Sequence, residues 1–170
     1  MNLIPAAFIP LLRHPRTPYA ANFLIACGLV VGALIITELW RLAACPLCIL
    51  QRMACLLLAL AALPGLLFNR VRILRILSAL LMLACTLTGA GIAAYQTWIQ
   101  RVAQDVQCSG EAAWWELLVD RAGEQFPLLF QASGLCSDPA WTLFGLSLAE
   151  YSLLSFCILT LIALYALLKR

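Results

Sequence analysis

The stretch CPLCILQR, residues 45–52, places two thiols and a guanidinium at the start of an apolar segment. The Cys-X-X-Cys spacing of Cys45 and Cys48 closes a loop too short to stabilise a fold by chain entropy. It is a common redox geometry, because a helix N-terminus stabilises a thiolate. Pro46 suits the first position of a helix, which predicts Cys45 as the N-cap residue and Cys48 in the first turn. Both sulfurs would then lie at the positive end of the helix dipole.

The rest of the chain must position this motif, and its composition indicates a membrane protein. Hydrophobic residues make up 64% of the 170 residues and charged residues 11%, against roughly 25% charged in a soluble domain. Four stretches approach the ~20 apolar residues with which a helix spans a bilayer. We therefore predict an all-α membrane protein built as a four-transmembrane-helix bundle. The expected segments are a tail at 1–19, spans at 20–37, 46–68, 76–99 and 149–168, connections at 38–45, 69–75 and 100–148, and an end at 169–170.

Charged residues separate between the two sides of this expected bundle. The tail, the 69–75 turn and the C-terminal end together carry seven basic residues and no acidic ones, whereas all eight acidic residues fall on the other side. The positive-inside rule then predicts a multi-pass membrane protein with both termini in the cytoplasm. The basic residues act as topology signals, so we expect no nucleic-acid partner.

The connection 100–148 is too long for a simple linker and is the expected working part outside the membrane. Within it, the stretch AAWWELLVD predicts a short helix with apolar side chains along one side: Trp114, Trp115, Leu117 and Leu118. Tryptophan favours the membrane interface, so this helix is expected to lie flat on the bilayer. A small packed loop helix is the alternative.

The eight cysteines divide by depth. Four lie inside spans, where cysteine behaves as a small hydrophobic residue: Cys27, Cys55, Cys85 and Cys157. The other four lie on the outer side, which in a bacterium is the oxidising periplasm: Cys45, Cys48, Cys108 and Cys136. Three pairings are open to them, and local spacing favours Cys45–Cys48 and Cys108–Cys136.

The second of these pairs also has a structural interpretation. A Cys108–Cys136 bridge would staple the outer loop, worth roughly 3.5 kcal/mol in the loop-entropy model. A zinc site is the rival for all four cysteines, but zinc ribbons usually supply two close pairs, whereas Cys108 and Cys136 are far apart in sequence. We therefore expect no metal.

Arg52 follows Cys48 by four residues and shares its helix face. It lies about 6 Å deeper along the helix, at 1.5 Å rise per residue. An arginine there can favour a Cys48 thiolate or hold a polar group of a ligand at the membrane edge. The alternative is an arginine that reaches back to lipid headgroups. The adjoining cysteine pair favours a functional role.

These features resemble the disulfide-bond formation protein B (DsbB) family of bacterial inner-membrane thiol:quinone oxidoreductases. The resemblance covers nearly the whole chain: four spans, CPLCILQR opening the second, and a long loop with two cysteines. The stretch ASGLCSDPAWTLFGLSLAEYS, residues 132–152, is also similar to the family's sequence around its fourth cysteine.

The resemblance implies an electron relay that supports disulfide bond formation. A periplasmic thioredoxin-like protein of the DsbA type would attack a Cys108–Cys136 disulfide at Cys108. Cys136 would then attack Cys45, and Cys48 would deliver the electrons to a membrane quinone, ubiquinone or menaquinone. A quinone is needed because the DsbA type is too strong an oxidant for an ordinary structural disulfide to regenerate.

The resemblance also implies three quinone-binding residues: Arg52, Gln96 and Gln100. Family members often read HVWLQ near the outer end of the third span, whereas residues 96–100 here read QTWIQ. The family histidine is therefore Gln96, which can donate a hydrogen bond but cannot become cationic near neutral pH.

Two other functions fit part of the pattern. Relatives of vitamin K epoxide reductase also combine a membrane Cys-X-X-Cys with loop cysteines and run electrons in the reverse direction, although their motif usually lies at a later span. A non-catalytic membrane scaffold with a disulfide-stapled loop would need no quinone, and Cys45 would matter no more to it than Cys108.

Overall fold

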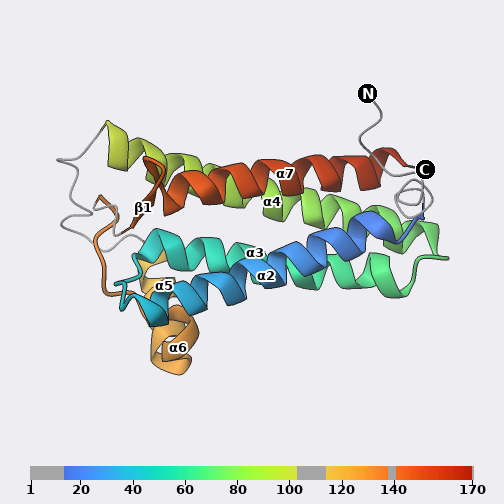
Figure 1. Ribbon diagram of the computed structural model, residues 1–170. Coiled ribbons are helices and arrows are strands. Elements are labelled where there is room, and N and C mark those ends of the chain that lie inside the picture. Colours follow the sequence, from blue (N-terminus) through green and yellow to red (C-terminus); the bar gives the residue numbers. More distant parts are fainter. Residues whose placement is uncertain (1–13, 103–113, 138–140, 170) are drawn as a thin grey trace.

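Four long helices form the bundle in the computed structural model, which describes residues 14–102, 114–137 and 141–169 (Figure 1). They are α2 (Thr17–Leu39), α3 (Pro46–Leu67), α4 (Arg72–Arg101) and α7 (Leu148–Leu168). All four are long and apolar enough to cross a membrane. The predicted all-α, four-helix membrane fold is therefore confirmed.

Local sequence signals start two of these helices. Cys45 is the N-cap of α3, where its sulfur accepts a hydrogen bond from the Cys48 N–H at 3.3 Å, and Pro46 follows in the first turn, as the sequence predicts. At α7, Ser147 and Glu150 form a reciprocal capping box. Both helices therefore begin at defined residues on the same end of the bundle, which we call the cysteine end.

Helix α3 contacts α2 on one side and α4 on the other, and α7 packs against α4 and α2. Small residues allow these close approaches, as is usual for helices in lipid. A Cβ on Gly89 would overlap the ring of Phe156, so the glycine lets α7 approach α4. The buried core of the bundle is correspondingly rich in alanine.

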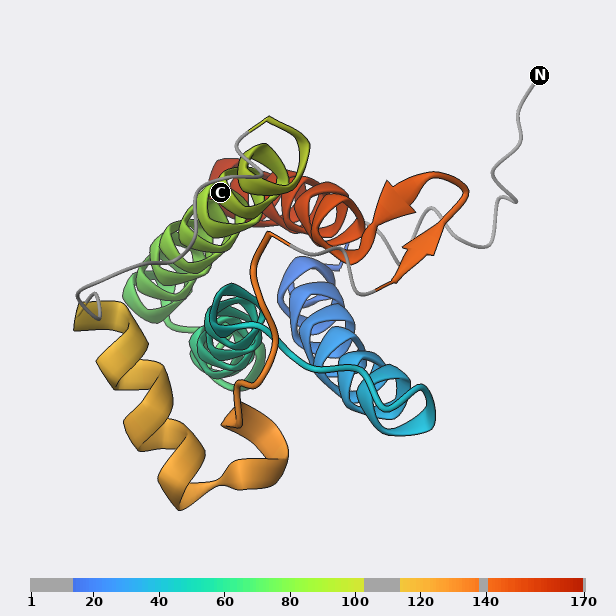
Figure 2. The ribbon, with the colours of Figure 1, turned by 90° about the vertical axis from the view of Figure 1, so that its left-hand side faces the viewer.

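The outer elements gather at the cysteine end (Figure 2). Two short helices, α5 (Trp114–Gln125) and α6 (Pro127–Phe130), lie to one side of α3. An antiparallel hairpin of β1 (Thr142–Leu143) and β2 (Leu146–Ser147) leads directly into α7. Sequence patterns did not predict α6 or this hairpin.

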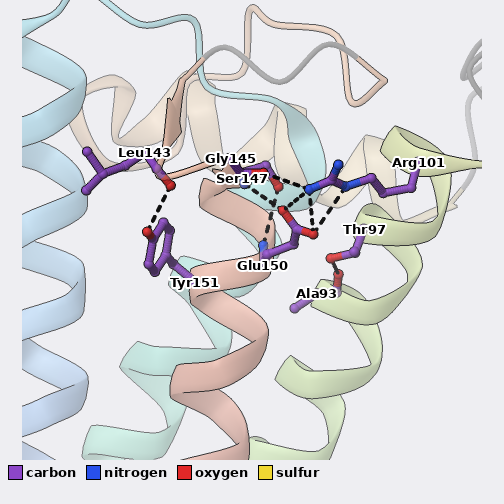
Figure 3. A network of polar contacts seen from close by, with 8 residues as sticks. All are labelled: Ala93, Thr97, Arg101, Leu143, Gly145, Ser147, Glu150 and Tyr151. Atoms are coloured by element: carbon purple, nitrogen blue, oxygen red, sulfur yellow. Dashed lines mark hydrogen bonds and ion pairs between the residues drawn. The ribbon is translucent and has the colours of Figure 1, made fainter.

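Polar contacts join the hairpin to two of the long helices (Figure 3). Arg101, at the end of α4, donates to the Gly145 carbonyl at 2.9 Å and pairs with the Glu150 carboxylate at 2.9 Å. The Tyr151 hydroxyl donates to the Leu143 carbonyl at 3.0 Å. The hairpin is therefore tied to the ends of both α4 and α7.

The predicted short outer helix is present as α5, but its faces differ from the expected arrangement. Trp114 is 78% exposed and lies on the outer face with the half-exposed Leu117 and Leu118. Trp115 instead turns inward, as does the fully buried Val119 one turn later. The expectation that both tryptophans share one side is therefore wrong, because neighbouring helical residues point about 100° apart.

Candidate functional site

The two cysteines of the CPLC motif lie next to each other at the start of α3. Their sulfurs are 2.7 Å apart, so a small shift closes the pair to a disulfide, whose S–S bond is about 2.05 Å. Cys45 is buried and Cys48 is half-buried. Both sulfurs lie at the N-terminus of α3, where unpaired N–H groups favour negative charge.

The segment after α6 crosses the cysteine end of the bundle above the start of α3 (Figure 2). The backbone N–H groups of Ser133 and Gly134 donate to the Ala44 carbonyl at 2.9 and 3.0 Å. A Cβ on Gly134 would overlap the Ala43 carbonyl, so this close approach requires glycine. The crossing fixes the course of the chain just before Cys136.

This course of the chain places Cys136 next to the Cys45–Cys48 pair. It is 2% exposed and packs in a cluster with Cys45, Leu47 and Ile99. Hydrogen bonding to the Cys136 and Cys48 sulfurs, together with burial, raises the pKa of the Cys45 thiol. Cys45 therefore contacts both of the other described outer cysteines. Cys108, the fourth predicted site cysteine, lies outside the described residues.

Gln96 approaches the pair from α4. Its Nε2 donates to the sulfurs of both Cys45 and Cys48, each at 3.2 Å. Its Oε1 accepts a hydrogen bond from Gln51 Nε2 at 2.8 Å. Gln51 belongs to the CPLCILQR stretch but had no predicted role, because sequence does not show which residue of α4 it faces.

Arg52, on α3, is 8% exposed and lies between α2 and α6. Its Nη2 donates to Thr37 Oγ1 in the last turns of α2 at 2.7 Å, and its Nη1 donates to the Leu129 carbonyl of α6 at 3.1 Å. The side chain thus bonds within the protein, which argues against the alternative of an arginine that reaches back to lipid headgroups. Neither partner carried a signal in the sequence.

Gln100 lies one turn beyond Gln96 on α4, and its side chain contacts the backbone of Cys136. Its Nε2 donates to the Cys136 carbonyl at 3.4 Å, and the side chain is 8% exposed. The structure thus brings together the six predicted site residues that it describes, and Cys108 lies outside the described residues. Gln51, Thr37 and Gly134 are additions that only the tertiary contacts reveal.

A cavity of about 380 Å³ opens beside the cysteine pair. Its polar end includes Cys48, Arg52 and Gln96. The remaining wall is mostly apolar and comes largely from α2 and α7, with residues such as Gly28, Gly32, Ala33, Ile36, Ala149 and Phe156. A cavity with donors at one end and apolar walls elsewhere suits an amphipathic ligand with a carbonyl-bearing head.

Fold and site together define a multi-pass membrane protein whose redox-type cysteine pair faces both an outer loop and a cavity among the spans. The family model described as "Disulfide bond formation protein DsbB" matches residues 15–166. The chain therefore belongs to the DsbB family, whose name places it among the oxidoreductases of disulfide bond formation.

Curated relatives agree with this family. Disulfide bond formation protein B of Methylobacillus flagellatus is 37% identical over 154 residues, which cover 87% of this chain and 90% of the relative. The protein of the same name from Nitrosospira multiformis is 34% identical over 161 residues, covering 94% and 95%. Disulfide bond formation protein B 1 of Pseudomonas fluorescens is 38% identical over 141 residues, covering 82% and 80%.

Proposed function

We propose that this protein is a thiol:quinone oxidoreductase that reoxidises a periplasmic thioredoxin-like protein of the DsbA type. In this proposal it lies in a bacterial inner membrane with both termini in the cytoplasm, as the charge distribution favours. One observation carries the proposal: the Cys45–Cys48 pair contacts Cys136 on its outer side and the cavity on its membrane side. The pair is thus positioned to take electrons from one side and release them on the other.

Electrons enter by thiol–disulfide exchange. A partner thiolate attacks Cys108 of a Cys108–Cys136 disulfide, which forms a mixed disulfide and releases the Cys136 thiolate. Cys136 then attacks Cys45 of the Cys45–Cys48 disulfide, and Cys48 leaves as a thiolate. The second partner thiol displaces Cys108 as a thiolate. Cys108 then attacks Cys136, which breaks the Cys136–Cys45 bond, releases the Cys45 thiolate and restores the loop disulfide. The partner leaves oxidised and the Cys45–Cys48 pair is left reduced.

The position of Cys136 supports the exchange with Cys45. Attack on a disulfide requires the incoming sulfur close to its target, and Cys136 lies within hydrogen-bonding reach of the Cys45 sulfur. The crossing at Gly134 and the hydrogen bond from Gln100 hold the Cys136 backbone in this place.

The cavity supports the exit of electrons to a membrane quinone, ubiquinone or menaquinone. A bound quinone supplies an acceptor for two electrons and two protons. Arg52 donates one hydrogen bond to Thr37 and one to Leu129. A guanidinium offers five N–H donors, so Arg52 retains donors for a carbonyl oxygen at the polar end of the cavity. Its charge also favours the Cys48 thiolate. Gln96 and Gln100 complete the proposed binding residues on α4.

The experiment is oxidation of a reduced DsbA-type protein by the purified chain in detergent without oxygen, with and without ubiquinone or menaquinone. We expect quinone-dependent loss of partner thiols that Cys48→Ala abolishes. Cys157→Ala, at an exposed cysteine of α7, is the matched control and keeps the activity.

Two results would contradict the proposal. No turnover with either quinone, although the Cys45–Cys48 and Cys108–Cys136 disulfides are present, would favour the scaffold interpretation. Net oxidation of quinol with reduction of the partner would favour the reverse direction of vitamin K epoxide reductase relatives.

A further inference from the structure

We propose that Gln51 is a positioning residue, whose side-chain amide orients the Gln96 amide so that the Gln96 NH2 group faces both sulfurs of the cysteine pair. The geometry stands without a quinone or a partner, and only its effect on turnover rests on the proposed function. Three hydrogen bonds carry the proposal, and they form one continuous chain from α3 to α4 and back to α3.

The direction of this chain of bonds depends on Gln51. Gln51 Nε2 donates to Gln96 Oε1 at 2.8 Å, and Gln96 Nε2 donates to the Cys45 and Cys48 sulfurs at 3.2 Å. An amide has its donor on one side and its acceptor on the other. If Gln51 keeps its orientation, a rotated Gln96 would turn its NH2 toward the Gln51 NH2 and its oxygen toward the sulfurs, and these three hydrogen bonds would be lost.

Burial makes this orientation persistent. Gln51 is 6% exposed and Gln96 is 2% exposed, and the two lie on facing helices. Little water is available there to replace a lost hydrogen bond, so an unpaired amide group is unfavourable. The Gln51 donor therefore holds the Gln96 amide in the orientation that the cysteine pair needs.

The oriented NH2 group acts on the reduced pair. Hydrogen bonds to a charged acceptor are stronger than those to a neutral one, so the Gln96 donors favour a thiolate over a neutral thiol. The titratable groups around the pair within the described chain are Arg52 on α3 and Cys136 on the loop. Gln96 adds a donor that stays neutral at every working pH, in the place where the family often has histidine.

The test measures alkylation of Cys48 in the reduced full-length protein by iodoacetamide as a function of pH, without partner or quinone, and identifies the modified residue by mass spectrometry. Gln51→Met keeps the side-chain length but removes the donor. We expect it to move the midpoint of the alkylation profile to higher pH by about one unit, a tenfold loss of thiolate below the midpoint.

A double variant separates positioning from a direct or merely structural role. Gln96→Met removes the sulfur donors themselves and should shift the midpoint at least as far. Because Gln51 acts through Gln96, adding Gln51→Met to Gln96→Met should cause no further shift. Gln51→Asn, whose shorter amide cannot reach Gln96, replaces Gln51→Met if that variant does not fold.

An unchanged midpoint in folded Gln51→Met or Gln51→Asn would overturn the proposal, and so would independent, additive shifts in the double variant. Failure of the proposed function gives a different result. If the wild-type protein shows no quinone turnover while the Gln51 and Gln96 variants show the expected alkylation shifts, the oxidoreductase proposal is contradicted and the role of Gln51 stands.

Discussion

The two ends of the bundle bury polar side chains in different ways. At the end opposite the cysteines, Tyr19, Asn69 and Ser78 each donate to a backbone carbonyl, those of Arg75, Gly65 and Ala61. At the cysteine end Arg52 and Gln100 also donate to backbone carbonyls, but a further set of bonds runs between side chains. Gln51 donates to Gln96, Gln96 donates to two sulfurs, and Arg52 donates to the Thr37 hydroxyl.

This difference indicates that the buried polar groups serve packing at one end and chemistry at the other. Carbonyls are present along every helix, so a polar side chain that uses one needs no particular partner residue. Bonds between side chains are the minority in proteins, and each depends on the identity and orientation of both groups. We therefore expect changes at the cysteine end to alter activity, and changes at the opposite end to alter stability with little effect on activity.

Among changes that leave the cysteines intact, the largest effect is expected for Arg52→Ala. Removal of the guanidinium should lower kcat/KM for quinone by roughly 10²-fold, the scale of losing one oriented donor at a reacting centre. The kcat/KM of Arg52→Lys should lie between those of the wild-type protein and Arg52→Ala, because an ammonium keeps the charge but lacks the planar fork of donors. The measurement is steady-state quinone reduction over a range of quinone concentrations. Arg72→Ala, at an exposed arginine at the other end, is the control, and an unchanged KM and turnover in Arg52→Ala would contradict the comparison.

Gly134→Ala should slow the transfer from the loop to the cysteine pair. The added Cβ meets the Ala43 carbonyl, which displaces the segment that carries Cys136, and roughly tenfold slower partner oxidation is expected. Quinone reduction driven by a small dithiol that reduces Cys45–Cys48 directly should keep its rate.

The matched control is Gly91→Ala, because a Cβ at Gly91 has no atom within 4 Å. Equal losses in the partner-driven and the dithiol-driven assays would show that Gly134 affects the whole site rather than the delivery of Cys136.

At the opposite end, Gly65→Ala should reduce stability without changing the chemistry. A Cβ there overlaps the Tyr19 ring and the Ser78 hydroxyl, and overpacking of this kind costs about 1–3 kcal/mol. The measurement is unfolding in detergent, with partner oxidation normalised to folded protein. A selective loss of quinone turnover in the folded variant would contradict the expectation that changes at this end affect stability and not activity.

The smallest effect is expected for Glu150→Gln, which removes the ion pair with Arg101 (Figure 3). The Arg101 side chain is 54% exposed, so its pairing is weak and screened. The glutamine oxygen can still accept from the Ser147 N–H, so the helix cap remains. We expect a small fall in melting temperature that disappears near 1 M salt, where the screening length is about 3 Å. A large fall that persists in salt would mean that the hairpin depends on this pair.

The sequence by itself determined the spans and the start of the redox helix. Spans follow from composition, because lipid offers no partners to the backbone and only long apolar helices satisfy it. The position of Cys45 and Cys48 at the start of α3 follows from Pro46 and the four-residue motif, which is a local property of the chain. Neither the spans nor the start of α3 therefore required knowledge of which helices are neighbours.

Only the tertiary structure decided what surrounds that motif. Gln51 meets Gln96 from 45 positions away, and Arg52 meets the Leu129 carbonyl from 77 positions away. Trp115 turned inward for the same kind of reason, since its face of α5 is set by the neighbouring chain. Such contacts depend on how helices rotate and pack against one another, which residue types and spacing leave open, and this packing turns a local cysteine motif into a site with an outer loop on one side and a cavity on the other.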